Sequence, residues 1–509
     1  MGRFMSKTQR KIIQSLFNAL SFKYSSKVFV RAISIILLLV LSQVTSCAQV
    51  QTAPTSISGP KFYQWAETPP MGWNSWDCFG AAVTEQQTME NAEYMEKNLK
   101  SHGWNIITID IQWYEPLARG SSYRRGAVLE MDANGRLLPA PNRFPSTKDT
   151  RSFKPIADKL HSIGLKLGIH LMRGIPRQAV DQNVPILGTS VHAADIADKR
   201  STCAWNTDMY GVDMAKPGAQ EYYDSVLALY ASWEIDFIKV DDLSAPSYHA
   251  QEVEAIRKAI DKTGRPIILS TSPGETPLSA GEQVEKQANM WRISNDFWDN
   301  WPALYAQFAR LNNWTPYRGP GHFPDADMLP VGNLRAWQSN NTWTNFTQDE
   351  QITLMTLWSI ARSPLILGAN LPKNDEFTLS LLTNDEVLSV NQKSTNNKQL
   401  FNQENHIVWV ADVPGSNDKY IAFFNATPAP APRGRGRGRG FQPANPAPET
   451  NPLETQPAEI SVSFSDIGIS GKYAVRDLWS HKDLDAASEN ISATVNSHGA
   501  VLYKISPIK

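Results

Sequence analysis

The strongest constraint on the fold is an alternation of short apolar runs and helical patterns, repeated from Pro69 to about Asn391. The apolar runs are Met71–Trp76, Ile106–Trp113, Lys166–Met172, Phe237–Asp241, Ile267–Thr271, Met290–Ser294 and Pro364–Gly368. Each has the length of a buried strand, and the segments between them have the period of amphipathic helices. Repeated strand–helix units predict a parallel sheet, because each helix returns the chain to start the next strand in the same direction.

About eight such units in roughly 320 residues match the usual size of a (β/α)8 barrel with insertions. An open doubly wound sheet is the alternative, but no glycine-rich phosphate loop follows any early strand. Capping-box patterns at Thr84–Gln87 and Thr347–Glu350 predict where two of the helices begin. We therefore expect an α/β fold with a TIM barrel over residues 67–393.

The character of the chain changes after about Ser394, where short β-rich runs follow one another without long helical patterns. These runs are His406–Val413, Lys419–Asn425, Glu459–Ser465, Lys472–Trp479 and Val501–Ile505. They predict a C-terminal antiparallel β-sandwich over residues 394–509. An insertion at residues 427–456 is rich in Pro, Ala and Gly and contains the Arg-Gly repeat Arg433–Arg439. Because this composition cannot bury a core, we expect the insertion to be a disordered loop.

The N-terminal segment carries basic residues, then the apolar run Ala32–Leu41, then Val44–Cys47. These features describe a secretory signal peptide, and the run is shorter than the ~20 residues of a transmembrane helix. Val44–Cys47 resembles the lipobox of bacterial lipoproteins, whose Cys is acylated; ordinary cleavage near a chance Cys is the alternative. We expect a signal peptide over residues 1–47, a lipid anchor at Cys47 and a tether over residues 48–66. The protein would then be exported and held at a bacterial membrane, in the periplasm or on the cell surface.

Composition also limits which molecules the protein is expected to bind. With 49 Lys and Arg against 50 Asp and Glu, the formal net charge of −1 gives no overall attraction to nucleic acid. The 16 Trp either fill a large core or offer flat apolar faces to sugar rings. The three cysteines, Cys47, Cys78 and Cys203, do not make a disulfide framework.

Acidic residues stand where the active sites of such barrels form, at the C-terminal ends of the predicted strands. Asp110 ends the second strand, Asp241 ends the fourth, Asp296 follows the sixth, and Asp325 and Asp327 form a further pair. Glycoside hydrolysis needs two carboxyl groups facing one bound ring, one ionised to attack the anomeric carbon and one protonated to release the leaving oxygen. The pattern therefore indicates a glycoside hydrolase with a carbohydrate substrate.

Lys239 lies two residues before Asp241, so both side chains point to one face of the strand. Buried charges are costly unless paired, so a simple Lys239–Asp241 ion pair is one interpretation. The functional interpretation is that Lys239 keeps Asp241 ionised for attack. A similar arrangement of Arg292 and Asp296, two strands further on, favours the functional interpretation.

Taken together, these motifs resemble glycoside hydrolase family 27, the α-galactosidase or melibiase family. The resemblance runs in the family's order from Pro69 to the β-domain. It is carried by Thr68–Trp76, Asn134–Ser146, Leu165–His170, Lys239–Asp241, Arg292–Asp296, Asp325–Leu329 and Pro364-Leu365.

The resemblance implies a retaining hydrolase, with Asp241 as the nucleophile and Asp296 as the acid/base. It also implies that the sugar pocket is lined by Trp76, Asp110, Lys239, Arg292 and Met328. The chemistry agrees, because Trp offers an apolar face, Lys and Arg donate to hydroxyls, and Asp accepts from them. Core packing is the alternative interpretation for the Trp and the Met.

Four positions depart from the family pattern. Asp110 is followed by Ile111, where many members have a second Asp that grips the galactose hydroxyls at C4 and C6. His170 stands where a Tyr follows the third strand. Ser272 stands near C2 of the sugar, where galactosidases often have Glu and N-acetylgalactosaminidases need room. Cys203 matches half of a pocket disulfide whose partner position holds no Cys. We keep His170 and Ser272 among the expected substrate-binding residues.

The sequence thus predicts an exo-acting hydrolase that releases terminal α-linked galactose through a covalent glycosyl-aspartate, without a metal or organic cofactor. Alternatives within the family are an α-N-acetylgalactosaminidase and a β-L-arabinopyranosidase, since arabinopyranose is galactose without its C6 group. A surface lipoprotein that binds glycans without cleaving them is the alternative from another class, and the presence of both aspartates argues against it. A metal-dependent enzyme is disfavoured, because no His pair or His/carboxylate cluster stands at strand ends in ligand spacing.

Overall fold

The structure, a computed structural model, describes residues 58–340, 342–426 and 456–508. The predicted signal peptide, the lipid anchor at Cys47, residues 48–57 of the tether and nearly all of the 427–456 insertion lie outside the described residues, so these expectations stay predictions. Within the described part of the predicted tether, Lys61–Trp65 form a 3-10 helix in which Phe62 and Tyr63 are buried, so this part packs against the fold. Within the described ranges, no helix combines the length and the apolar character needed to cross a membrane.

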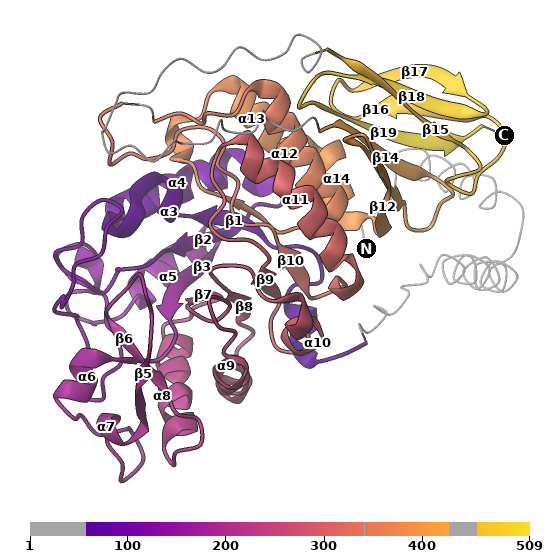
Figure 1. The fold of residues 1–509 in the computed structure, drawn as a ribbon. Helices are drawn as coiled ribbons and strands as arrows, with labels where there is room; N and C mark the ends of the chain where they lie inside the picture. The colour runs from indigo at the N-terminus through magenta and orange to yellow at the C-terminus, as the bar shows by residue number, and fades with distance from the viewer. Residues whose placement is uncertain (1–57, 341, 427–455, 509) are drawn as a thin grey trace, which may run out of the picture. The chain divides into compact units, whose positions relative to one another are not determined.

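Eight parallel strands form the main sheet, as the alternation predicts (Figure 1). Their order is β10-β9-β8-β7-β3-β2-β1-β11, and a parallel bridge between Leu329 and Leu367 joins the segment after β10 to β11. The sheet therefore closes, and the predicted (β/α)8 barrel is confirmed. The strands are β1 (Met71–Asn74), β2 (Ile106–Ile109), β3 (Lys166–Met172), β7 (Phe237–Asp241), β8 (Ile268–Thr271), β9 (Met290–Arg292), β10 (Phe323–Asp325) and β11 (Leu365–Leu367).

Helices return the chain between consecutive strands of the barrel (Figure 1). Both predicted capping boxes are present, because Thr84 accepts from the main chain of Gln87 and Thr347 accepts from that of Glu350. The longer helices are α4 (Glu85–Asn98), α5 (Lys154–Ser162), α8 (Ala219–Ser232), α9 (Ala250–Thr263), α11 (Trp301–Trp314), α12 (Gln348–Ala361), α13 (Glu376–Leu382) and α14 (Asp385–Lys393). Short helical turns are α3 (Trp76–Phe79), α6 (Arg177–Asp181), α7 (Ala193–Ile196) and α10 (Gly281–Val284).

An insertion between β3 and β7 forms a small antiparallel sheet that the sequence does not predict. Its strands are β4 (Ile175–Pro176), β5 (Ala197–Thr202) and β6 (Met209–Val212), in the order β4-β6-β5. The turn between β5 and β6 carries Cys203 and Trp205. This insertion thereby supplies side chains to the C-terminal end of the barrel.

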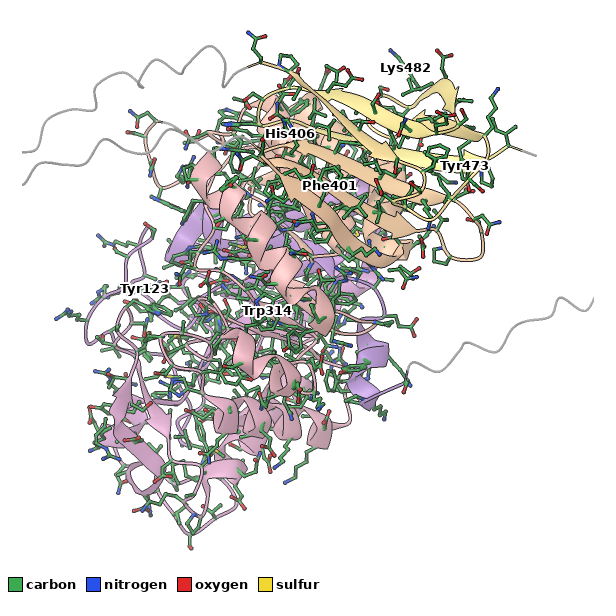
Figure 2. The ribbon with its side chains drawn as sticks, turned by 45° about the vertical axis from the view of Figure 1, so that its right-hand side comes forward. Tyr123, Trp314, Phe401, His406, Tyr473 and Lys482 are labelled. Atoms are coloured by element: carbon green, nitrogen blue, oxygen red, sulfur yellow. The ribbon has the colours of Figure 1, made fainter. Side chains whose placement is uncertain are left out.

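The C-terminal strands form two antiparallel sheets, a six-stranded one in the order β12-β13-β14-β19-β16-β17 and the pair β15-β18. Apolar side chains of both sheets share one buried cluster, so the predicted sandwich is confirmed (Figure 2). The strands are β12 (Thr395–Gln403), β13 (His406–Asp412), β14 (Lys419–Asn425), β15 (Ala458–Ser463), β16 (Tyr473–Asp477), β17 (Lys482–Ala487), β18 (Asn490–Val495) and β19 (Ala500–Pro507).

Candidate active site

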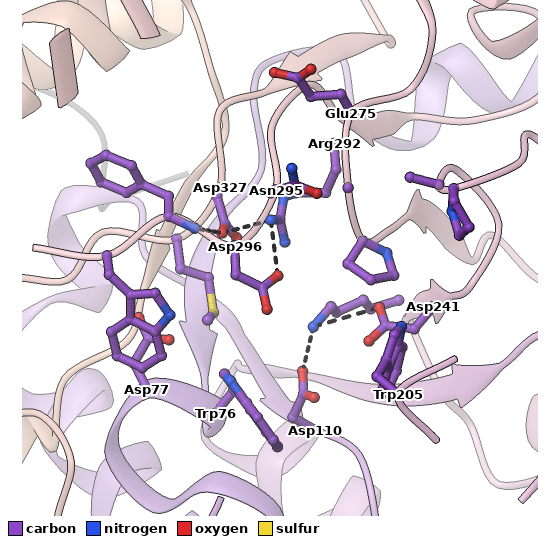
Figure 3. A pocket seen from close by; sticks show the side chains of 18 of the residues that line it. Trp76, Asp77, Asp110, Trp205, Asp241, Glu275, Arg292, Asn295, Asp296 and Asp327 are labelled. Carbon is purple, nitrogen blue, oxygen red and sulfur yellow. Dashed lines mark hydrogen bonds and ion pairs between the residues drawn. The ribbon is translucent and has the colours of Figure 1, made fainter. Parts of the chain in front are cut away.

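A cavity of about 770 Å³ opens at the C-terminal ends of the barrel strands. Asp241, at the end of β7, and Asp296, after β9, both line it (Figure 3). The topology explains why they meet, because all eight parallel strands deliver their C-terminal ends to the same side of the barrel. The other predicted residues that line this cavity are Trp76, Asp110, Lys239, Arg292 and Met328.

At the base of the cavity, Lys239 lies between two carboxylates, those of Asp110 and Asp241. Its Nζ lies 2.9 Å from Asp110 Oδ2 and 3.7 Å from Asp241 Oδ1, so its closer partner is Asp110 (Figure 3). Asn74 also donates to Asp110 Oδ2, at 2.6 Å. Burial alone would lower the pKa of Lys239, but the two carboxylates outweigh it and raise that pKa. Lys239 is therefore a fixed positive charge at the base of the site.

His170 lies beneath the predicted nucleophile rather than on the cavity wall. The residue is fully buried, and its Nε2 lies 3.0 Å from Asp241 Oδ2. Burial alone would raise the pKa of Asp241, but Lys239, His170 and Arg292 together hold that pKa below its usual range. The carboxyl group of Asp241 is therefore kept ionised, as an attacking group must be.

In another part of the cavity wall, Arg292 pairs with two further aspartates. Its Nη2 lies 2.8 Å from Asp327 Oδ2 and 3.2 Å from Asp296 Oδ1. Asp327 Oδ2 also accepts from the main chain of Phe297 at 2.7 Å, which fixes the loop that carries Asp296. The side chain of Asp296 is 60% exposed, whereas Asp241 is buried. The two carboxyl groups thus meet in one cavity in different environments.

Ser272, like His170, is placed behind the cavity wall. Ser272 is fully buried, and its Oγ accepts from Arg292 at 3.4 Å. Neither residue is among those that line the cavity. Contact between the sugar and these two side chains stays a prediction.

Sequence reasoning missed several residues of the cavity wall. Tyr123 stacks on Trp76, with ring centroids 5.7 Å apart, and Trp205 lies next to Tyr123 at 5.3 Å. Asp77 and Trp298 also line the cavity. Except for Asp77, which directly follows a recognised motif, these residues come from loops that no strand pattern locates. Trp73 and Trp104 are fully buried and belong to the core, whereas Trp76 and Trp205 line the cavity.

Although the sequence shows no His/carboxylate cluster in ligand spacing at strand ends, the fold brings one group of side chains among the described residues to the spacing of metal ligands. Ligand atoms of Asp110, His170 and Asp241 lie within 4.8 Å of one another. Lys239 already occupies the space between the two carboxylates as their cation. A divalent ion would have to displace this ammonium group, so the donor set suits an ion-paired active site better than a metal centre.

Comparison with known proteins agrees with this geometry. The family model for alpha galactosidase A matches residues 210–393, and that for the alpha galactosidase C-terminal beta sandwich domain matches residues 403–505. A family 27 β-L-arabinopyranosidase from Geobacillus stearothermophilus, solved with arabinose, is 48% identical, with a TM-score of 0.81, over 88% of this chain and 99% of that one. The chain belongs to glycoside hydrolase family 27.

Other relatives of this family 27 hydrolase carry different names. A solved Bacillus halodurans protein, provisionally named an alpha-N-acetylgalactosaminidase, is 44% identical, with a TM-score of 0.74, over 87% of this chain and 98% of that one. An alpha-galactosidase from Cyamopsis tetragonoloba is 26% identical over 449 residues, which is 87% of each chain. The expected fold and reaction class, glycoside hydrolysis, are therefore confirmed.

In this family 27 hydrolase, the two described cysteines are free, buried thiols, Cys78 and Cys203. Cys203, which matches half of a pocket disulfide in the family pattern, is therefore not disulfide-bonded here.

A buried ion-pair cluster stands behind β7, the strand that ends in Asp241. Arg173, directly after β3, lies 2.7 Å from both Asp242, directly after β7, and Glu252 of α9. Arg173 is 2% exposed, so this cluster is part of the interior that supports Asp241.

Proposed function

We propose that this family 27 hydrolase releases terminal β-L-arabinopyranose from glycans, with terminal α-galactose as its second substrate. The observation that carries the proposal is Ile111, an apolar side chain directly after Asp110, where many family members have a second carboxylate. The proposal is supported by the relatives. The β-L-arabinopyranosidase from Geobacillus stearothermophilus is 48% identical to this chain, whereas the alpha-galactosidase from Cyamopsis tetragonoloba is 26% identical.

The two sugars differ at one place, because arabinopyranose has the ring hydroxyls of galactose but no C6 hydroxymethyl group. Ile111 is 1% exposed and packs in the barrel core, while its main-chain N–H donates to Asp110 Oδ1 at 2.7 Å. A galactose C6 hydroxyl would therefore lack the acceptor that a second Asp provides. An unsatisfied buried hydroxyl costs about 1–3 kcal/mol, and a pentose has no such group.

In the proposed reaction, Asp241 attacks the anomeric carbon while Asp296 protonates the departing oxygen. A glycosyl-aspartate forms, water then attacks it with Asp296 taking the proton of the water, and the anomeric configuration is retained. Lys239 keeps Asp241 ionised, and the exposure of Asp296 leaves room for the leaving group. Asp110 and Lys239 bind ring hydroxyls, and Trp76 lies against the apolar face of the ring.

Initial rates on 4-nitrophenyl glycosides test the proposed substrate. We expect kcat/KM for the β-L-arabinopyranoside to exceed that for the α-D-galactopyranoside by about 10-fold or more. The α-N-acetylgalactosaminide belongs in the same panel as the third sugar. Asp241→Asn protein, prepared in the same way, controls for contaminating host enzymes. A preference for the galactoside or for the N-acetylgalactosaminide would contradict the proposal.

Ile111→Asp is expected to shift the preference towards galactosides. The new carboxylate supplies an acceptor for the C6 hydroxyl, so the galactoside-to-arabinopyranoside ratio of kcat/KM should rise by about 10-fold. Ile111→Asn is the matched control, because it adds a polar side chain without the charge. Since a buried carboxylate lowers stability, Tm is measured for both variants. An unchanged ratio in folded Ile111→Asp protein would show that position 111 does not select the sugar.

His170→Phe is expected to move the acid limb of the kcat/KM–pH profile to higher pH. His170 helps to hold the pKa of Asp241 below its usual range, so removing the imidazole raises that pKa. Attack requires ionised Asp241, and activity is lost as the pH falls through this pKa. His170→Gln keeps an N–H donor and should move the limb less. If neither variant moves the limb, His170 does not act on the nucleophile.

A further inference from the structure

Asp77 is a carboxyl group of the cavity wall to which the family resemblance gives no role. It is the second residue of α3, it lines the same cavity as Asp241 and Asp296, and it is 2% exposed. Figure 3 shows it across the cavity from Asp241. Its chain neighbour Trp76 is a predicted sugar-binding residue, so Asp77 stands close to the expected position of the ring.

One oxygen of the Asp77 carboxyl group, Oδ2, is buried without a hydrogen-bond partner among the described residues. Burial, together with the carboxylates of Asp327 and Asp296, raises the pKa of Asp77 well above its usual range. This shift favours the protonated form of the carboxyl group, in which it can donate a hydrogen bond. A buried polar group without a partner is destabilising, and a hydrogen bond to a ligand oxygen would satisfy it.

The fold holds this carboxyl group in place. The main-chain oxygen of Asp77 accepts from Arg335 N–H at 2.7 Å, and that of Cys78 accepts from Ala336 N–H at 2.7 Å. Gly368, directly after β11, leaves the necessary room, because a Cβ at this position would lie 2.2 Å from Asp77 Oδ2. The end of β11 thus has no side chain at the point where the carboxyl group of Asp77 enters the barrel mouth.

The strand order decides which part of a sugar Asp77 meets. β11 is the fourth strand from β7 in both directions, through β3, β2 and β1 on one side and through β8, β9 and β10 on the other. In the proposed reaction Asp241, at the end of β7, attacks the anomeric carbon, so this carbon must lie next to the end of β7. The wall over β11 therefore faces the opposite end of the pyranose ring, which carries the C4 hydroxyl and the C5 substituent.

We propose that Asp77 is a further sugar-binding residue, which donates a hydrogen bond as a carboxylic acid to an oxygen at the end of the ring remote from the anomeric carbon. The inference rests on the proposed function, which sets the orientation of the ring. Asp77 complements Asp110, because an ionised carboxylate can only accept from a sugar hydroxyl, whereas a carboxylic acid can donate to it. One hydroxyl can take part in both hydrogen bonds.

Two near-isosteric variants test the role of Asp77. Asp77→Asn keeps a neutral donor, and Asp77→Leu keeps the volume without a donor. Free L-arabinose and D-galactose are measured as competitive inhibitors, because a free sugar has no leaving group and its Ki reports the sugar contact alone. We expect the Ki of the Asn variant to stay within about 3-fold of wild type and that of the Leu variant to rise about 10-fold. The Tm of the Leu variant should not fall, because an apolar group replaces an unpartnered polar one.

The outcomes separate this inference from the proposed function. Unchanged Ki values in Asp77→Leu would overturn it, and so would weaker binding accompanied by a clear fall in Tm, which marks a structural role. Equal weakening in Asp77→Asn and Asp77→Leu would also overturn it, because the Asn variant still donates. Failure of the proposed substrate would instead appear in the wild type, as a preference for the galactoside. In that case, the Ki values of galactose for wild type, Asp77→Asn and Asp77→Leu would decide whether Asp77 binds the sugar.

Discussion

Replacing Asp241 with Asn is expected to lower kcat by about 10⁴-fold or more, whatever the leaving group. An amide cannot form the glycosyl ester, and a better leaving group does not help, because the attack itself is lost. The fold should survive, since Asn has nearly the same shape and Lys239 keeps its closer partner, Asp110, at 2.9 Å. Rates on 4-nitrophenyl and 2,4-dinitrophenyl glycosides measure the loss, and Tm confirms that the variant is folded.

Asp241→Ala in the presence of azide is the matched control. The shorter side chain leaves room for the anion to attack from the side of the nucleophile, which gives a glycosyl azide of inverted configuration. Rescue with a retained product would place the nucleophile elsewhere. Residual activity of more than about 1% in purified Asp241→Asn protein would also show that another residue is the nucleophile.

Asp296→Asn is expected to cause a loss that depends on the leaving group. For oligosaccharides and alkyl glycosides, whose leaving oxygen needs a proton, kcat/KM should fall by about 10²–10⁴-fold. For 2,4-dinitrophenyl glycosides the loss should be much smaller, because this group departs as a stable anion. A plot of log kcat/KM against the pKa of the leaving group should therefore be steeper for the variant than for wild type.

Glu275→Gln is the control for this second prediction. Glu275 is another carboxylate of the same cavity wall, and its side chain is 47% exposed and paired with Arg310. Its replacement should leave the slope of the plot unchanged. A steeper slope in Glu275→Gln, together with an unchanged slope in Asp296→Asn, would assign proton transfer to Glu275 instead.

Periodicity predicts the barrel well because buried parallel strands are short, continuous apolar runs. Lys166–Met172 and Phe237–Asp241 have the same bounds in the sequence prediction and in the structure. β10 gives no such signal, since its three residues, Phe323–Asp325, include a Pro and an Asp. β12 is a polar edge strand, and β17 is largely exposed, so neither buries enough apolar surface to leave a pattern.

Site residues can be predicted from the sequence where they stand at strand ends, but not where they lie in loops. Asp241 and Lys239 follow from strand ends and from the alternation of side chains along a strand. His170 pairs in register with Lys239 and shares this logic, yet it lies behind the wall against Asp241, which the alternation of side chains does not predict. Tyr123 and Trp205 come from long insertions, whose path is set by packing between segments far apart in the sequence.

In the proposed mechanism, hydrolysis proceeds through a covalent sugar ester on Asp241. Incubation with a 2-deoxy-2-fluoro glycoside that carries an activated leaving group tests it most directly, because fluorine slows hydrolysis of the intermediate and lets it accumulate. Peptic digestion and mass spectrometry should then find one labelled peptide, which contains Asp241, with the added mass on that residue. A label on another residue would contradict the account, and so would an unlabelled enzyme that releases the inverted sugar as its first product.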